Sequence, residues 1–152
     1  GQGFTIALDT LDGGRLGIAS QALGIARAAI DLMRDHLAAQ VDAKGRPAAT
    51  QPDQWTFADL ASELDAYRFL TWRAAVLRDR GIRCSTEAAM AKSCASRLAN
   101  RATRAAVSML GPVGASGANA AERLLRDARI TEIYEGATDI QRLVVARGLL
   151  QP

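Results

Sequence analysis

Apolar residues recur every seven positions over residues 16–37, and this spacing limits the possible folds more than any other feature of the chain. The row and its offset positions are Leu16, Ala19, Leu23, Ala26, Ile30, Met33 and Leu37. Residues at this spacing share one face of an α-helix, and the alanines allow a neighbouring helix to approach closely. The stripe therefore predicts a long helix packed against others, and favours packing over a cofactor role.

The composition agrees with a helical core. Hydrophobic residues make up 49% of the 152 residues, but aromatic residues only 5%, so the core must consist mainly of Ala, Leu, Ile and Val. A β-sandwich would require more Val, Thr and Tyr. A chain of this length suits one domain with a substantial core. We therefore expect a single helical domain over residues 1–152.

Glycine, proline and capping residues divide the chain into helices. Residues 1–12 read as a short lead-in, and Asp12 can cap a first helix that begins at residue 13. Breaks are expected at residues 43–53, at Gly81 and at Gly111-Pro112, and Ser85 or Thr86 can cap the third helix. The later helices are expected at about residues 54–80, 85–110, 122–127 and 139–150. The pattern predicts an all-α, up-and-down four-helix bundle with a short extra helix.

Charge, cysteines and hydropathy argue against several functions. The net charge is +3 and the basic residues are interleaved with acidic ones, so no nucleic-acid partner is expected. Cys84 and Cys94 do not form a metal-ligand pattern, and His36 has no partner nearby in sequence. No uninterrupted apolar run approaches the roughly 18 residues of a membrane span, and the N-terminus does not resemble a signal peptide. We expect a cytoplasmic protein without a metal or a membrane span.

Residues 126–143 carry the clearest candidate for chemistry. Thr138 followed by Gln141 has the form of a capping box, which places Glu135 in the turn before a helix N-terminus. The helix dipole favours a carboxylate there, and Gly136 allows a sharp turn. On spacing alone, most such carboxylates serve only the helix end, so a structural role for Glu135 is the more frequent interpretation.

The same stretch resembles a known family. Residues 133–142 read I-Y-E-G-A-T-D-I-Q-R and resemble the acyl-CoA dehydrogenase signature I-Y-E-G-T-S-E-I-Q-R. The segments G-Q-G-F, T-L-D-G-G-R-L-G-I-A, E-A-A-M-A-K and L-L-R-D-A-R-I also resemble that family, so the similarity covers residues 1–150. The resemblance implies the C-terminal helical domain of such an enzyme, with the family's N-terminal helical and middle β-domains absent from this chain.

The resemblance also implies a reaction. It is the α,β-dehydrogenation of an acyl-CoA thioester by an FAD-dependent oxidoreductase of fatty acid metabolism, with Glu135 as the base. Asp12, Arg15 and Gly136 would bind the substrate. Gln51, Gly111, Thr138, Asp139 and Gln141 remain compatible with FAD contacts. Some family members place the base on the first helix, at the position of Gly14, but glycine has no carboxylate.

The resemblance implies partners as well. An electron-transfer flavoprotein would take up the electrons, and the bundle would form a homo- or hetero-oligomer. Trp55 and Trp72 lie off the apolar row of their helix and suit contacts with another subunit. The domain by itself is expected to be inactive.

Five positions depart from the family's flavin contacts. Gln40 stands in place of an Arg that reaches the FAD pyrophosphate of a neighbouring subunit, and Gln cannot replace the guanidinium charge. The others are Ala43, Ser108, Pro112 and Ala137 in place of Phe, Gln, Gly and Thr. These changes leave two alternatives: a degenerate or structural subunit of a hetero-oligomeric acyl-CoA dehydrogenase with impaired FAD binding, or a helical interaction module in which Glu135 only serves a helix end.

Overall fold

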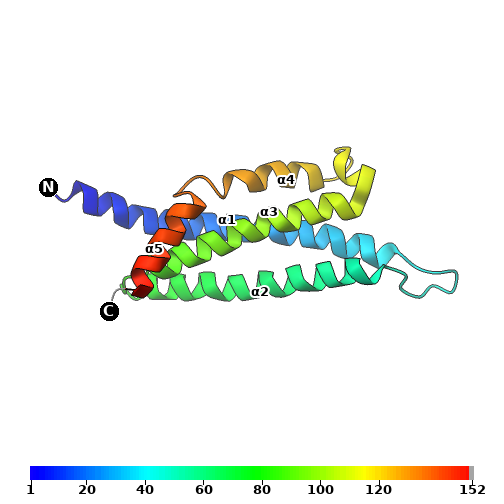
Figure 1. Cartoon of the computed structure of the whole chain (residues 1–152), viewed down its shortest axis with the longest axis horizontal. Coiled ribbons are helices and arrows are strands. Elements are labelled where there is room, and N and C mark those ends of the chain that lie inside the picture. The colour runs from blue at the N-terminus through cyan, green and yellow to red at the C-terminus, as the bar shows by residue number, and fades with distance from the viewer. Residues whose placement is uncertain (151–152) are drawn as a thin grey trace.

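Three long helices lie along one another, and two shorter ones complete the bundle (Figure 1). The computed structural model describes residues 1–150 and their side chains apart from those at positions 4, 5, 8 and 9, which include the Phe of the opening G-Q-G-F. The helices are α1 (Gly3–Ala39), α2 (Gln51–Asp79), α3 (Ser85–Ala115), α4 (Ala121–Ile130) and α5 (Thr138–Leu150). Helix α4 runs back along α3 and α1, whereas α5 crosses one end of the bundle. Since the described residues contain no strand, the predicted all-α bundle is confirmed.

The core forms mainly where α1 meets α3, because alanine rows on both helices allow close approach. The buried alanines of the two helices are Ala19, Ala22, Ala26, Ala29, Ala91, Ala95, Ala99, Ala102 and Ala106. Larger side chains, among them Ile30, Met33 and Leu98, fill the space between these rows. Of the predicted stripe on α1, every residue except the half-buried Leu16 is buried. The seven-residue spacing therefore identified the buried face correctly.

The first helix begins earlier than the sequence predicts. Helix α1 starts at Gly3, so Asp12 lies inside the helix and does not cap it. The pair Gly13-Gly14 was a misleading start signal, because its glycines serve close contacts with other segments. A Cβ atom at Gly13 would meet the Arg78 guanidinium at 2.7 Å, and one at Gly14 would collide with the Glu135 carboxylate. Tertiary contacts here outweigh the low helix propensity of glycine.

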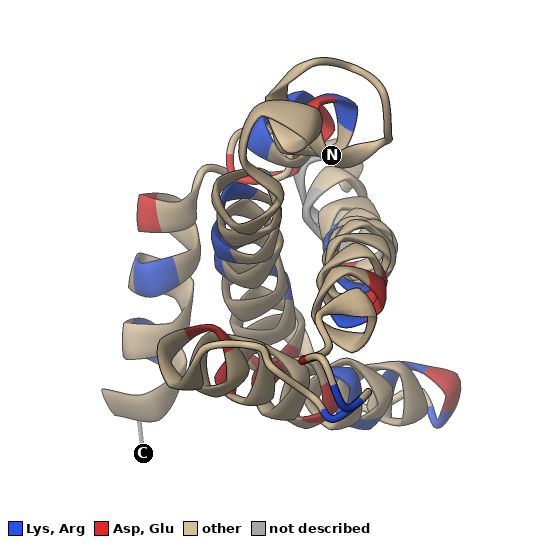
Figure 2. Ribbon diagram, turned by 90° about the vertical axis from the view of Figure 1, so that its right-hand side faces the viewer, with Lys and Arg blue, Asp and Glu red and all other residues tan. Residues whose placement is uncertain are grey.

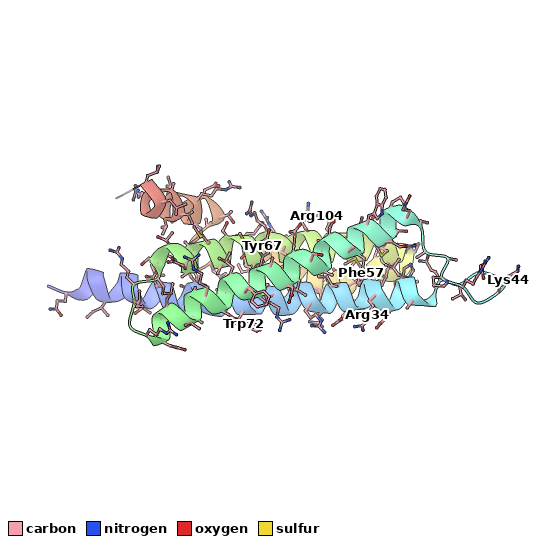
Figure 3. All side chains as sticks on the ribbon, turned by 90° about the horizontal axis from the view of Figure 1, so that it is seen from below. Arg34, Lys44, Phe57, Tyr67, Trp72 and Arg104 are labelled. Carbon is pink, nitrogen blue, oxygen red and sulfur yellow. The ribbon has the colours of Figure 1, made fainter. Side chains whose placement is uncertain are left out.

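Two other helix boundaries also differ. Helix α2 begins at Gln51, before the predicted residue 54, because the Thr50 hydroxyl accepts a hydrogen bond from the Asp53 N–H. Helix α3 passes through a kink at Gly111, with φ 59° and ψ −137°, and continues to Ala115. Glycine tolerates this conformation, so the predicted stop at Gly111-Pro112 is a bend. The loop between α1 and α2 projects from the bundle, with Lys44 near its tip (Figure 3).

Helix α1 is long and apolar enough, by length and composition, to cross a membrane over Thr10–Ala39, where the mean hydropathy reaches 1.3. The sequence prediction missed this because it considered only uninterrupted apolar runs. Inside the bundle, 44% of that window is buried. A helix at the centre of a bundle meets the same criterion as a spanning helix, so its core position accounts for the hydropathy.

Acidic and basic residues are interspersed along the helices (Figure 2). Many pair within one helix, as Arg126 does with Glu122 and Arg27 with Asp31. Arg101 reaches from α3 to Glu63 on α2 and forms a two-pronged pair at 2.7 and 2.9 Å. Exposed pairs of this kind each contribute about 0–1 kcal/mol, so the buried alanine rows dominate the stability of the bundle.

Candidate active site

The turn between α4 and α5, residues 131–137, has an unusual backbone. Glu135 has φ 53°, the only positive φ of a non-glycine residue within residues 1–150, and Gly136 follows with φ 97°. A left-handed conformation costs a residue with a side chain about 1–2 kcal/mol. Such a residue persists where surrounding contacts hold it in place. The contacts around Glu135 therefore determine its position.

Three polar side chains on α3 hold this turn and the last residues of α4 from one side. Lys92 Nζ donates to the Gly136 carbonyl at 2.7 Å, Ser96 Oγ to the Thr131 carbonyl at 2.8 Å, and Asn100 Nδ2 to the Ala128 carbonyl at 3.0 Å. Residues four apart share a helix face, so the three form one buried row, which we call the polar row. This row was not predicted from the sequence, although polar residues at four-residue intervals in an alanine-rich helix are a signal for it.

Helix α5 holds the turn from the other side, but without a capping box. The Gln141 N–H bonds to the Ala137 carbonyl, and the Thr138 hydroxyl lies 3.5 Å from the Glu132 carbonyl. The Gln141 side chain is buried, and its Nε2 donates to the carbonyls of Glu135 at 3.1 Å and Gly136 at 3.0 Å. The predicted capping role of Thr138 is therefore wrong, because Gln141 turns inward to the strained peptides.

The Glu135 carboxylate lies directly against α1 at Gly14. A Cβ atom at Gly14 would lie 2.5 Å from Glu135 Cδ and 2.9 Å from Oε1, so only glycine leaves room for the carboxylate. Glu135 Oε2 is buried and has no hydrogen-bond partner in the part of the chain that the structure describes. The two positions at which the resemblance places a base are thus in contact, and one carboxylate fills the space between them.

Arg15 is buried next to this contact. Its Nη1 donates to Asp12 Oδ1 at 2.6 Å, and the other oxygen of Asp12 accepts a hydrogen bond from Ser85 Oγ. Ser85 therefore donates its hydroxyl hydrogen bond to Asp12, and α3 has no side-chain cap hydrogen bond in the described structure. The Arg15 Nε atom is buried without a partner among the described residues. The carboxylate thus fixes one side of the guanidinium and leaves Nε available.

The three buried side-chain atoms without a partner in the described structure are Arg15 Nε, Glu135 Oε2 and Gln141 Oε1. They belong to one region, because Gln141 holds the Glu135 carbonyl and the charges of Arg15 and Glu135 both act on Lys92. Burial lowers the pKa of Lys92, Arg15 lowers it further, and Glu132 and Glu135 oppose this effect. An unsatisfied buried polar atom costs about 1–3 kcal/mol. Several in one place are expected where a ligand supplies the missing partners.

The predicted cofactor contacts fall into two groups. Thr138, Asp139 and Gln141 lie beside Glu135 at the start of α5, whereas Gln51 and Gly111 lie at the opposite end of the bundle (Figure 1). Gly111 is 19 residues after Lys92 on α3, which corresponds to about 28 Å of helix. The predicted substrate residues therefore lie near the first group of predicted cofactor contacts, and the second group lies far from them.

The first group offers hydrogen-bond donors and an acceptor that the described residues leave unused. The N–H groups of Asp139 and Ile140 make no backbone hydrogen bond among the described residues, and they point from the positive end of a helix. Gln141 Oε1 lacks a donor. At the other end, Gln51 is exposed and Gln40 half-buried, and neither can supply charge to a pyrophosphate.

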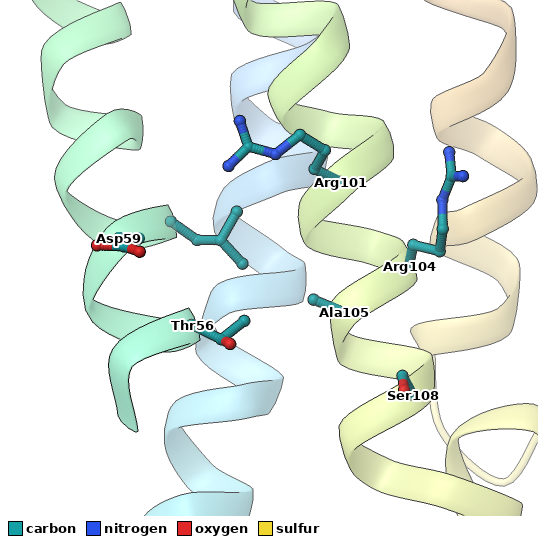
Figure 4. Close-up of a pocket in the computed structure, with 7 residues that line it drawn as sticks. Thr56, Asp59, Arg101, Arg104, Ala105 and Ser108 are labelled. Atoms are coloured by element: carbon teal, nitrogen blue, oxygen red, sulfur yellow. The ribbon is translucent and has the colours of Figure 1, made fainter. Parts of the chain in front are cut away.

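A groove of about 610 Å³ lies on the surface between α2 and α3 (Figure 4). Its lining consists of Thr56, Asp59, Leu60, Arg101, Arg104, Ala105 and Ser108. None of these residues contributes to the site around Glu135. Ser108, which replaces a flavin-contacting Gln of the family, lies in this groove, toward the end of the bundle that holds Gly111.

Comparison with known sequences places the chain. The model of the acyl-CoA dehydrogenase C-terminal domain matches residues 1–150. The mitochondrial short-chain specific acyl-CoA dehydrogenase of Bos taurus is 52% identical, over 99% of this chain and 37% of that protein. An acyl-CoA dehydrogenase of Bacillus subtilis is 46% identical, over 99% of this chain and 40% of that protein.

Solved structures agree with this placement. Butyryl-CoA dehydrogenase from Megasphaera elsdenii superposes with a TM-score of 0.93 and 40% identity, covering 99% of this chain and 39% of that one. A chain in the structure described as the electron transferring flavoprotein of Acidaminococcus fermentans superposes with a TM-score of 0.93 and 41% identity. The match covers 99% of this chain and 40% of that one. The chain spans less than half the length of these relatives. By sequence and by fold, it belongs to the acyl-CoA dehydrogenase family and corresponds to the C-terminal domain.

Proposed function

We propose that the chain acts as the C-terminal domain of an FAD-dependent acyl-CoA dehydrogenase, in which Glu135 removes the α-proton of an acyl-CoA thioester. The observation that carries this proposal is the Glu135 carboxylate, which is held in a strained turn with a buried oxygen that has no partner in the described structure. Such a carboxylate can accept a proton without first giving up a hydrogen bond to the protein.

Other parts of the turn suit the same step. Negative charge develops on the thioester oxygen as the α-proton leaves, so the site needs hydrogen-bond donors. The Glu135 N–H makes no hydrogen bond to another described residue and is available as such a donor. Gly136 carries no side chain, so a substrate can approach its backbone. Bound FAD would accept the β-hydrogen as hydride.

The paired Asp12 and Arg15 would bind the substrate from α1. Their hydrogen bond fixes the guanidinium close to the Gly14–Glu135 contact. A guanidinium with a vacant N–H is suited to an oxygen of the acyl-CoA, because it offers both charge and direction. Since the bovine relative is named as short-chain specific and a structural relative as butyryl-CoA dehydrogenase, we propose a short acyl chain.

We expect the full-length flavoprotein to bind FAD. Under anaerobic conditions, butyryl-CoA should bleach the absorbance of the bound flavin, and palmitoyl-CoA should do so more slowly. The physical reason is that the base and the donors of the α5 end are intact even though the charge at Gln40 is lost. Flavin titration and absorbance would measure both. A folded protein that takes up no FAD would instead favour the alternative of a degenerate subunit with impaired FAD binding. That alternative is supported by the five departures from the family's flavin contacts, at Gln40, Ala43, Ser108, Pro112 and Ala137.

We also propose that the domain associates with other subunits through α2 and that an electron-transfer flavoprotein is the redox partner. Trp55, Phe69 and Trp72 are 61%, 60% and 53% exposed, and all three belong to α2 (Trp72 is labelled in Figure 3). Phe69 packs edge-on against Trp72 at 5.5 Å, and Arg68 lies 5.1 Å from the Trp72 ring. Exposed aromatic groups of this kind mark interaction surfaces.

Sedimentation of the 152-residue chain should therefore show dimers or larger species, and Trp72→Glu should shift them toward monomer. A charge placed in a buried interface is unfavourable, whereas on a free surface it has little effect. Ala146→Glu, at an exposed position of α5, a helix with no contact to α2 in the described structure, serves as the matched control. A strict monomer at high concentration would contradict self-association.

A further inference from the structure

We propose that Lys92 is a positioning residue for Glu135, whose ammonium group fixes the Gly136 carbonyl and thereby the peptide that carries the base. This inference rests on the proposed function of Glu135. Lys92 is fully buried, and its Nζ lies 2.7 Å from the Gly136 oxygen. A buried lysine is costly, because its charge leaves water, and so a specific interaction must compensate.

The position of Lys92 is suited to this task. The Gly136 carbonyl accepts two hydrogen bonds, from Lys92 on α3 and from Gln141 on α5, so the turn is clamped between two helices. Of the two donors only Lys92 is charged, and a charge-assisted hydrogen bond is the stronger kind. Glu135 and Gly136 both have positive φ, and without the clamp the turn can relax to a more common conformation.

Relaxation of the turn would move the Glu135 carboxylate away from its place over Gly14. The side chain has no hydrogen bond at Oε2, so its position depends on the backbone and on the contact with α1. Glu132, Glu135 and Arg15 are the charged groups that act on Lys92. Glu132 is itself paired with Arg129 at 2.6 Å, and Arg15 is paired with Asp12. Of these charged groups, Lys92 is therefore the cation that is hydrogen-bonded to the Glu135 turn.

Lys92→Met in the full-length flavoprotein tests this assignment, because methionine keeps much of the length and removes the donor. We expect kcat to fall at least 10-fold, since misplacement of a catalytic group by about 1 Å can cost on the order of 10²-fold. KM should change little, because the substrate contacts of Asp12 and Arg15 remain. Hydrogen exchange at the Thr138 amide, which closes the turn by bonding to the Glu132 carbonyl, should become faster.

Thr103→Ala is the matched control, because Thr103 is equally buried on α3 but its hydroxyl bonds only to the Ala99 and Asn100 carbonyls of its own helix, away from the Glu135 turn. It should lower the melting temperature but leave kcat near the wild-type value. Equal kcat in Lys92→Met and wild type, or equal losses in both variants, would overturn the assignment. If Lys92→Met does not fold, Lys92→Gln replaces it with the same criteria.

Failure of this inference and failure of the proposed function give different results. If Glu135→Gln abolishes turnover while Lys92→Met does not reduce kcat, Glu135 remains the base and only the role of Lys92 is wrong. If Glu135→Gln retains turnover, the proposed function fails, and Lys92 then has no base to position.

Discussion

Glu135→Gln should lower turnover of the full-length flavoprotein by about 10²–10⁴-fold, the usual loss when a general base is removed. Glutamine keeps the size of the side chain and fits the same space over Gly14, so the fold should remain intact. Binding of acyl-CoA and FAD should stay close to the wild-type level, because the base acts in the transition state. Single-turnover reduction of the flavin, together with acyl-CoA titration, measures the two effects separately.

Glu132→Gln is the control for this experiment. Glu132 lies in the same turn, three residues earlier, but its carboxylate is engaged by Arg129 at 2.6 Å. Its removal should affect the chemical step far less than the loss of Glu135, because Glu132 acts on the site only through the charge of Lys92. Turnover by Glu135→Gln at the wild-type rate would end the assignment of Glu135 as the base, and a comparable loss in Glu132→Gln would indicate a general disturbance of the turn.

Gly14→Ala should reduce kcat by on the order of 10²-fold, although it adds only one methyl group. The new Cβ would occupy the space of the Glu135 carboxylate, 2.5 Å from its Cδ, so the flexible side chain must move. The melting temperature should change little, because the group that must move is the end of the flexible Glu135 side chain and not the backbone. Steady-state kinetics and thermal denaturation of the same preparation would separate the two quantities.

Gly17→Ala provides the comparison within the same helix. Gly17 is exposed, and a Cβ atom there has no heavy atom within 4 Å. Alanine should therefore stabilise α1 by about 0.5–1 kcal/mol and leave kcat unchanged. If Gly14→Ala retains full activity while Gly17→Ala is stabilising as expected, the carboxylate is not held over α1 during the reaction.

The positions of the helices follow largely from local patterns in the sequence. The seven-residue row of α1 identified the buried face, since residues at that spacing share one side of a helix regardless of what packs against them. The predicted limits of α4 and α5 lie within a few residues of the observed ones. The start of α1 was wrong, because Gly13 and Gly14 are explained by Arg78 and Glu135, side chains that local propensity does not include.

The sequence also singled out Glu135 as the candidate base, but through resemblance and not through spacing. The predicted capping box did not form, because Gln141 turns to the carbonyls of the strained turn. Likewise Ser85 binds Asp12 and does not cap α3. In each case a polar side chain can either cap its own helix or bond to another segment, and the packing of the helices determined which bond forms.

By itself, then, the sequence determined the helical class, the alanine-rich core and the motif that holds Glu135, because each depends on composition or on residues close together in the chain. The tertiary structure alone decided how the base is held. Lys92 reaches Gly136 across 44 residues, and Gly14 meets a carboxylate from the other end of the chain. Such contacts form only when the helices pack, since burial of the core sets which faces meet and thus which polar groups lose water and require each other as partners.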